Sequence, residues 1–524
     1  MVIDDQIASE KNIIGRSVGM ISLLNIVLAL LALGRDILTA SLLGTTTIAD
    51  AFFLGYSIPD FVSNTIGASI GLACILVLSS SHSENNLLEL ERTLSSIIIS
   101  ILIGTFFIAV FCFFTSDSII NWIGGGFAEE TIDLSVWLFR ILLPIIVIFP
   151  IYSILSSVLQ INLHFFMPSF GQVLFNTIIV SVLLIMVYFH ANEQESVFFL
   201  AHSVWFATLI MAAVQSLPLR FMKIKWIMSF SGKYMKEIYS VLFPIIFISV
   251  SSQLVLLVER ILASHTGAGG IAGLNYAYKL AQFPVWTFAS AASVVTFPLM
   301  SRFYNKDNIG SLNSVLNNGI RLIVFVNLPL SVVIFVLRYP LVELLFKHGA
   351  FGDYSVNVTV SILTGYSLSI VAQSVNYPLA RSFYTIGKFG TVLFITGVVS
   401  CFTIAAEIIL VNYLGAAGIG YGAAFGAAIN TLLLTLWLLR EIDFQPAGLL
   451  PSLGPMAAAC IPLVLVLHSF QDILPDKIVS HGANEFIRFL LIAGVGAATY
   501  LFACLLLKVE EARLFWVNVQ RVFK

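Results

Sequence analysis

Long apolar runs separated by short polar segments repeat along the whole chain. A membrane-spanning helix needs about 20 mostly apolar residues, and fourteen segments meet this requirement. They lie near residues 18–43, 51–80, 93–115, 133–160, 170–189, 196–217, 236–258, 272–301, 316–337, 354–380, 388–413, 416–439, 452–470 and 485–507. The pattern predicts an all-α polytopic membrane protein with about fourteen transmembrane helices.

The amino-acid composition supports this prediction. The 524 residues are 59% hydrophobic and 10% charged, whereas soluble domains carry about 25% charged residues. The first 17 residues contain several charges, and no cleavage site of a signal peptide follows them. We therefore interpret 1–17 as a cytoplasmic N-terminal segment ahead of an uncleaved first span. The net charge of −2 gives no indication of a nucleic-acid partner.

The basic residues predict how the chain is oriented in the membrane. If successive loops alternate between the two sides, 18 of the 26 Lys and Arg residues lie on the side of both termini. The opposite side has Arg260, Arg338, Lys347 and Lys477, and the spans contain Arg35, Arg140, Lys279 and Arg488. Because cytoplasmic loops are enriched in Lys and Arg, we expect a multi-pass protein with both termini in the cytoplasm.

Two segments resemble each other at a spacing of 225 residues. Residues 35–59 match 260–284 without a gap, and the paired positions are Arg35 and Arg260, Gly44 and Gly269, Asp50 and Asn275, and Pro59 and Pro284. Further matches relate Gly126-Phe127 to Ala350-Phe351, and residues 170–177 to 389–396. About six spans separate the copies, so both have the same orientation in the membrane. We predict two pseudo-symmetric six-helix lobes, 18–230 and 231–450, followed by two extra helices and a cytoplasmic tail, 451–524.

Several common catalytic motifs are missing from the sequence. Walker A, His-Glu-x-x-His and Cys-x-x-Cys patterns do not occur, and the loops are short. The five cysteines are scattered through apolar runs without metal-binding or disulfide spacing. We expect no catalytic residue, no metal and no cofactor. A membrane chain built from two repeats indicates a transporter whose substrate path lies between the repeats.

Charged residues inside the spans or at their ends are the candidates for substrate binding, because a charge within the bilayer costs a few kcal/mol. They are Arg35, Asp36, Asp50, Arg260 and Lys279 on the first two helices of each lobe, and Arg140 on the fourth span. Cations in a lipid-accessible cleft suit an anionic head group such as a diphosphate, which Arg binds through paired hydrogen bonds. A purely structural role is also open: Arg35 pairs with Asp36 or Asp50, and Arg260 extends to the membrane surface.

Glu407 is isolated in an apolar run of the eleventh span. A buried, unpaired carboxylate is costly, so we expect it to be protonated or to bind a cation. With Thr403 one turn earlier, it is a candidate coupling site for Na⁺ or H⁺; the membrane potential is a further candidate driving force. A carboxylate that forms a hydrogen bond to a neighbouring helix would fit the same pattern.

Several motifs resemble those of the MurJ/MviN-type lipid II flippases, and the resemblance runs through all fourteen spans. They are Gly34-Arg35-Asp36, Asp50-Ala51-Phe52-Phe53, Pro59-Asp60, Arg140 with Pro144, Tyr278-Lys279, Phe283-Pro284 and Gly349-Ala350-Phe351. The resemblance implies the superfamily of polysaccharide-lipid and multidrug exporters, two lobes with alternating access, and a groove for the lipid tail at the last two spans. It further implies a bacterial cytoplasmic membrane and lipid II, an undecaprenyl-diphosphate-linked peptidoglycan precursor, as substrate. Membrane lipids and the cell-wall synthesis machinery are then the expected partners.

The chain departs from the family pattern at positions that usually carry a further positive charge. Ala29, Ser63 and Asn64 stand where the family usually has Arg, and Lys279 stands where Arg is common. Another polyprenyl-diphosphate-linked glycan therefore stays open as the substrate. The sequence is also compatible with a cation-coupled multidrug antiporter of the same superfamily, and with a non-transporting membrane scaffold or glycan-assembly enzyme.

Overall fold

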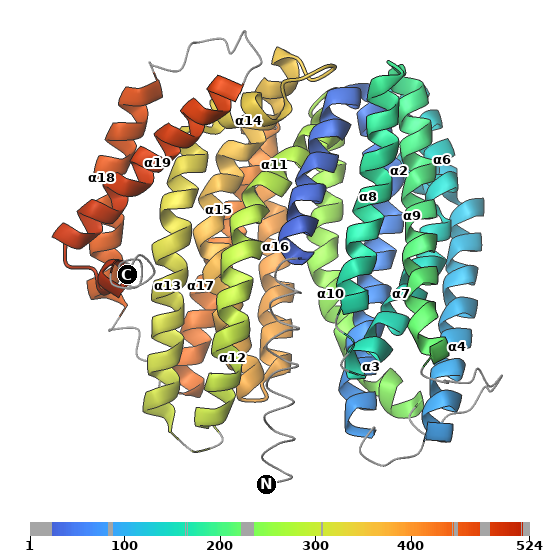
Figure 1. Ribbon diagram of the computed structural model, residues 1–524, viewed down its shortest axis with the longest axis horizontal. Coiled ribbons are helices and arrows are strands. Elements are labelled where there is room, and N and C mark those ends of the chain that lie inside the picture. The colour runs from blue at the N-terminus through green and yellow to red at the C-terminus, as the bar shows by residue number, and fades with distance from the viewer. Residues whose placement is uncertain are drawn as a thin grey trace. The chain divides into compact units, whose positions relative to one another are not determined.

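The computed structural model describes residues 24–81, 87–162, 164, 166–221, 235–304, 306, 308–442, 444, 449–471, 483–514 and 516. Within these ranges every regular element is a helix (Figure 1). Thirteen of these helices are long and apolar enough to cross a membrane, and each corresponds to a predicted span. The remaining predicted span, 272–301, forms the helical stretch 270–304. The predicted N-terminal segment 1–17 lies outside the described residues.

The chain divides into two compact units, of which the first contains the residues up to Gly269 together with His348–Phe351. Its helices are Leu24–Leu43, α2 (Thr47–Val62), η1 (Ser63–Gly67), α3 (Ala68–Ser81), α4 (Leu87–Phe114), α5 (Ser116–Ile123), α6 (Glu129–Leu142), α7 (Pro144–Ile161), α8 (Phe166–Tyr188), α9 (Glu193–Phe221) and α10 (Met235–Ser264). Ile70, Ile97, Leu155 and Leu242 belong to one buried apolar cluster that joins α3, α4, α7 and α10. Apolar side chains also cover the outside of α4, as expected of a helix that faces lipid.

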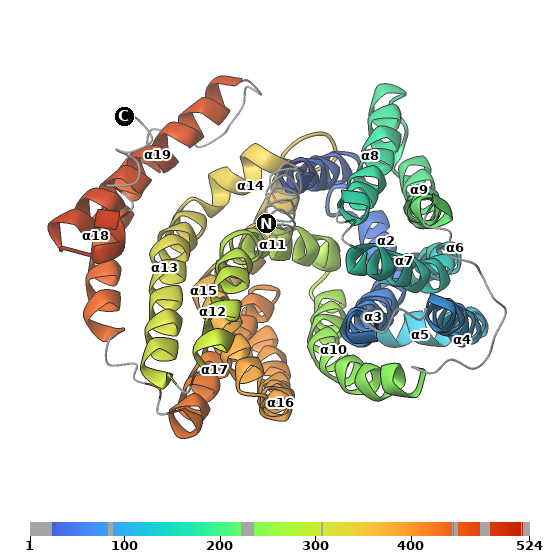
Figure 2. The ribbon, with the colours of Figure 1, turned by 60° about the horizontal axis from the view of Figure 1, so that its bottom comes forward.

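The second unit contains residues 270–347 and 352–524. Its helices are α11 (Gly270–Pro284), η3 (Val285–Ala289), α12 (Ser290–Tyr304), α13 (Ile309–Val336), α14 (Arg338–Phe346), α15 (Asp353–Thr385), α16 (Phe389–Leu414), α17 (Ala417–Glu441), α18 (Leu450–Gln471) and α19 (Ala483–Leu506). In both ribbon views α18 and α19 lie beside α13 (Figures 1 and 2). The two C-terminal helices are therefore attached to this unit through α13.

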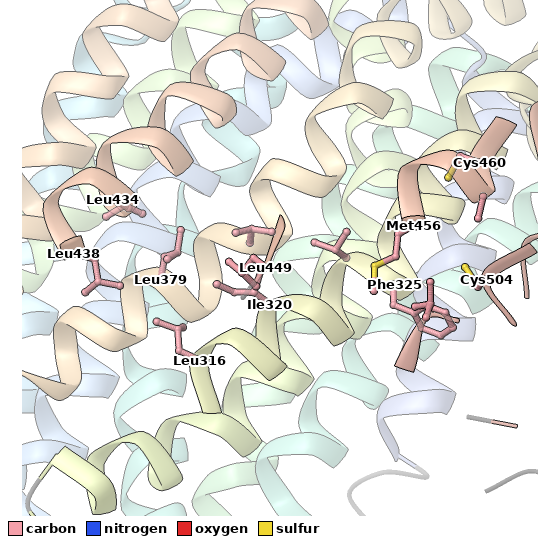
Figure 3. Packing of buried hydrophobic residues seen from close by; sticks show 14 of the residues in the cluster. Leu316, Ile320, Phe325, Leu379, Leu434, Leu438, Leu449, Met456, Cys460 and Cys504 are labelled. Carbon is pink, nitrogen blue, oxygen red and sulfur yellow. The ribbon is translucent and has the colours of Figure 1, made fainter. Parts of the chain in front are cut away.

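One apolar cluster holds α18 and α19 to the other helices of the second unit. Buried side chains of α13, α15 and α17 meet those of α18 and α19 in it, and they include Phe325, Leu379, Leu438, Met456 and Cys504 (Figure 3). An ion pair adds to this packing, because Arg321 of α13 contacts the carboxylates of Glu510 (2.6 Å) and Glu511 (2.5 Å). The chain after α19 is thus fastened back onto α13.

Helix α10 packs with the first unit, although the internal repeat assigns it to the second lobe. Ile238 and Leu242 of α10 are buried in the cluster that contains Ile70 of α3. The hydroxyls of Ser69 and Ser249 form a hydrogen bond of 3.1 Å between η1–α3 and α10. The repeat follows similarity along the chain, whereas the compact units follow packing. The first unit therefore extends to Gly269 and includes α10, while the predicted first lobe ends at residue 230. The predicted lobes 18–230 and 231–450 stay a prediction.

The short segment His348–Phe351 packs on the turn after the first helix. Ala350 donates its backbone N–H to the carbonyl of Ser41 at 2.8 Å. Gly44 and Gly349 both have positive φ, 57° and 59°. A Cβ on Gly44 would collide with the backbone of Ala350, and one on Gly349 with the backbone of Ser41. In the matching position of the first copy, Gly126 lies against the backbone of Ser264. In both copies a glycine-containing segment thus packs closely against the turn that follows a helix.

Two five-residue π-helical segments follow prolines at related places in the two copies. In the first unit α2 contains Pro59 and continues into η1. In the second unit α11 ends at Pro284 and continues into η3. Single π turns inside α-helices occur often at functional sites, so both segments mark the second helix of each copy as locally irregular.

Candidate substrate-binding site

Arg35 lies in the first described helix and pairs with its chain neighbour Asp36. The Arg35 Nε and Nη2 atoms donate to Asp36 Oδ1 at 3.1 and 3.0 Å. The two side chains are 25% and 11% exposed, so this pair is shielded from most solvent. Screening is weak in such a place, and each charge acts strongly on the other. The structure therefore contains the pair between Arg35 and Asp36 that the sequence analysis gave as the structural alternative for Arg35.

Arg260 of α10 contacts α2 at two points. Its Nη2 atom lies 3.1 Å from Asp60 Oδ2, and its Nη1 atom donates to the carbonyl of Ser57 at 3.2 Å. Asn64 donates from Nδ2 to the other carboxylate oxygen of Asp60 at 2.8 Å. Sequence reasoning did not select Asp60, because its partner comes from a helix about two hundred residues away. The available signal was the spacing of Ser57, Asp60 and Asn64, which share one face of a helix.

Tyr56 lies near both ion pairs. It lies within electrostatic range of Arg35, Asp60 and Arg260, and its ring stacks on Phe52 at 6.1 Å. We call Arg35, Asp36, Tyr56, Asp60 and Arg260 the charged cluster. The structure thus brings together Arg35, Asp36 and Arg260 of the predicted site, and adds two residues that the sequence-based prediction lacked.

Asp50 lies outside the charged cluster, at the start of α2. Its side chain is fully buried, and Oδ2 accepts a 2.5 Å hydrogen bond from the backbone N–H of Gly269. The neighbouring residue Thr46 caps the same helix by accepting from Ala49 N. This hydrogen bond fixes the turn after α10 against the start of α2, because the charged carboxylate of Asp50 accepts from a backbone N–H of that turn.

Arg140 lies at a junction of α4, α5 and α6, and Lys279 is part of the second unit. Arg140 of α6 is exposed, lies 2.8 Å from Asp117 Oδ2, and donates to the Ser116 hydroxyl at 2.8 Å. Its guanidinium also lies over the Phe113 ring, 5.4 Å from the centroid. These contacts join α6 to the end of α4 and the start of α5. Lys279 is half-buried on α11 and belongs to the second unit.

Glu407 and Thr403 lie on the face of α16 that packs against α17. Glu407 is fully buried and Thr403 is 6% exposed. A Cβ at Gly422 would collide with Glu407, and one at Gly426 would collide with Thr403, so these two glycines allow the close approach of the helices. The Thr403 hydroxyl donates to the carbonyl of Val399 at 2.9 Å. No group of three or more His, Cys, Asp and Glu side chains suited to a metal occurs in the described part of the chain.

Comparison with known proteins decides the family. Residues 39–474 match the model of the family "Lipid II flippase MurJ", which covers most of the chain. The chain belongs to the MurJ family. The match contains the charged residues of α2 and α10 as well as Glu407, while Arg35 and Asp36 lie just ahead of it.

Curated MurJ proteins are similar to this chain over nearly its whole length. The "Probable lipid II flippase MurJ" of Buchnera aphidicola subsp. Acyrthosiphon pisum is 26% identical over 511 residues, which cover 95% of this chain and 98% of that protein. The "Lipid II flippase MurJ" of Burkholderia cenocepacia is 22% identical over 446 residues, with 83% and 86% covered. The MurJ family is one of transporters and not of enzymes.

Solved structures show the same fold. A structure of "Lipid II flippase MurJ, inward closed conformation" has a TM-score of 0.78 at 23% identity, covering 95% of this chain and 99% of that one. An inward-facing multidrug resistance MATE transporter of the MOP superfamily has a TM-score of 0.69 at 17% identity, with 79% and 94% covered. The chain is thus a multi-pass helical membrane protein with the MurJ fold, which MATE transporters share in outline.

Proposed function

We propose that this protein moves lipid II, an undecaprenyl-diphosphate-linked glycan, from the inner to the outer leaflet of a bacterial cytoplasmic membrane. Membership of the MurJ family supports the reaction type, and the curated relatives bear lipid II in their names. The observation that carries the proposal is the charged cluster, in which two arginines share one region of the first unit. A scaffold protein has no need of such charges within membrane helices, because each costs free energy to insert.

The chemistry of the charged cluster suits a diphosphate. Guanidinium groups bind phosphate oxygens through two parallel hydrogen bonds, and these bonds are strong where water is scarce. Arg35 and Arg260 are the two residues we propose for this contact. We propose Lys279 independently, as a cation of the second unit that binds an anionic head group. Lys279 contributes a point charge without a paired donor geometry.

Alternating access requires contacts that close one end of the protein and later break. We propose three contacts of the first unit for this role: Ala350 N–H to Ser41 O, Gly269 N–H to Asp50, and Gly126 against Ser264. With both termini in the cytoplasm, as the basic residues predict, all three lie at the outer end. We propose that they close this end while the head group binds from the inside. Their separation would then release the substrate outward.

Glu407 is our candidate for coupling transport to a cation. It is a fully buried carboxylate facing Gly422, with the Thr403 hydroxyl one turn away. Burial favours the neutral or ion-bound form of a carboxylate. A change of occupancy by H⁺ or Na⁺ would therefore change the contact between α16 and α17.

A second candidate substrate is another polyprenyl-diphosphate-linked glycan. Asp60 favours this candidate, because its carboxylate already neutralises Arg260 in the first unit. A head group that gains more of its affinity from contacts with its sugars would suit a charge-balanced site better than one that relies on free arginines.

The test is rescue of a bacterium depleted of its own lipid II flippase. Wild type is compared with Arg35→Ala, with Lys279→Ala and with Arg440→Ala, an exposed arginine of α17 that serves as the control. We expect growth with wild type and Arg440→Ala, and at least about a tenfold loss of viability with the other two variants. Absence of rescue by correctly inserted wild type would exclude lipid II and favour the second candidate.

A further inference from the structure

Asp60 is held from two sides by residues that leave neither of its oxygens free. Oδ2 lies 3.1 Å from Arg260 Nη2, and Oδ1 accepts from Asn64 Nδ2 at 2.8 Å. Ser57, Asp60 and Asn64 project from one face of α2 and η1, while Arg260 comes from α10. The contacts with Asn64 and Arg260 thus fix the orientation of the Asp60 carboxylate opposite the guanidinium of Arg260.

The pair between Asp60 and Arg260 is mostly shielded from solvent. The Arg260 side chain is 13% exposed and that of Asp60 is 24% exposed. One terminal nitrogen of Arg260 donates to the Ser57 carbonyl and the other faces the Asp60 carboxylate, so both ends of the fork are occupied. A phosphate oxygen that approaches Arg260 must displace at least one of these protein acceptors.

The formal charges within the charged cluster cancel. Arg35 faces Asp36 and Arg260 faces Asp60, at 3.0 and 3.1 Å. Asp60 belongs to a different helix from Arg260. Separating this pair therefore also separates two helices.

We propose that Asp60 is the internal counter-anion of Arg260 and determines which head groups the site accepts. This inference rests on the proposed function, since it assumes that a diphosphate binds Arg260. In the substrate-free protein Asp60 occupies Arg260, and a diphosphate replaces it, because two phosphates offer more oxygens and more charge than one carboxylate. An anion with fewer oxygens and less charge than a diphosphate, such as a monophosphate, gains less over Asp60 and is disfavoured. Asp60 is a specificity-determining residue, and it loosens the contact between α2 and α10 when substrate binds.

The test measures binding of two soluble prenyl probes to the purified full-length protein. Farnesyl diphosphate and farnesyl monophosphate are titrated against wild type, Asp60→Asn, Arg260→Gln and the double variant. Asn retains the shape of Asp and can still contact Asn64, while it removes the competing charge. Asp117→Asn is the matched control, because Asp117 also pairs with an arginine in the same unit but lies outside the charged cluster.

We expect Asp60→Asn to bind both probes at least about fivefold more tightly than wild type, and the monophosphate to gain the most. Arg260→Gln should weaken diphosphate binding, and in that background Asp60→Asn should have no further effect. Asp117→Asn should match wild type. Thermal unfolding of each variant shows whether a loss of binding reflects a loss of folding.

The outcomes separate the two proposals. If wild type binds the diphosphate and Asp60→Asn leaves or weakens that binding, the role of Asp60 is overturned while the proposed function stands. If a folded wild type and folded Asp60→Asn both fail to bind the diphosphate, the head-group site and the role of Asp60 fall together.

Discussion

The backbone N–H of Ala350 donates a hydrogen bond of 2.8 Å to the carbonyl oxygen of Ser41. This bond places a short segment of the later half of the chain inside the first compact unit. The close approach depends on Gly44 and Gly349, both with positive φ and both without room for a Cβ. The contact is therefore open to a direct test by adding one methyl group.

Gly349→Ala should destabilise this contact. An L-residue at positive φ costs about 1–2 kcal/mol, and the new Cβ would meet the backbone of Ser41. We expect a lower melting temperature of the purified protein and weaker rescue of a depleted strain. Gly352→Ala is the control in the same loop, since Gly352 has φ −85° and open space around its Cβ position. Equal melting temperatures for the two variants would contradict the assignment.

Lys347 precedes this segment and supplies a pH-dependent contact. Its Nζ lies 2.6 Å from Asp353 Oδ1 and 2.8 Å from Glu343 Oε1. The hydrogen bonds to Asp353 and Glu343 raise the pKa of Lys347 above its ordinary value of 10.5. A raised pKa in the folded state means that the contribution to stability is complete below that ordinary value and is lost as the pH rises through the folded value.

Lys347→Met should therefore lower the melting temperature by a constant amount from about pH 7 to about pH 10, and the difference from wild type should shrink at higher pH. Lys306→Met is the control, because Lys306 is exposed and the described residues show no ion pair for it. A difference that persists unchanged above about pH 11 would show that Lys347 stabilises the protein through packing alone.

Glu407→Gln tests the proposed coupling site. The amide keeps the shape of the side chain between α16 and Gly422 but cannot take up a proton or balance a cation. We expect the dependence of transport on Na⁺ or on the pH gradient to fall at least about tenfold, with an unchanged or higher melting temperature. Glu441→Gln, whose carboxylate pairs with Lys388 at 3.4 Å, is the control. A lower melting temperature with intact ion dependence would assign Glu407 to structure instead.

The sequence predicted the helical class and the spans well, because a bilayer imposes length and apolarity on every spanning helix. Those constraints act locally and can be read from one stretch of chain at a time. The predicted span 272–301 is helical as well, within the stretch 270–304 that contains the π segment η3.

Side-chain partners were harder to predict, because they depend on contacts between distant helices. Arg35 could be placed beside Asp36 from adjacency alone. For Arg260 the structural role expected from the sequence was at the membrane surface, whereas its guanidinium in fact meets Asp60 and Ser57. Arg140 shows the converse, since a charge that the pattern placed deep within a span pairs with Asp117 at a helix junction. Only the packing of α10 and α5 determines these partners.

The π segment η1 rotates the face that the helix after it presents to α10. On a regular α-helix the nine residues from Asp60 to Ser69 would turn the direction by about 900°, which leaves Ser69 on the opposite side. A π turn accommodates one additional residue, and the remaining eight leave Ser69 only about 80° away from Asp60. Both residues contact α10, through Arg260 and Ser249. One extra residue thus sets the angular phase that lets a single helix face hold its ion pair and its serine contact together.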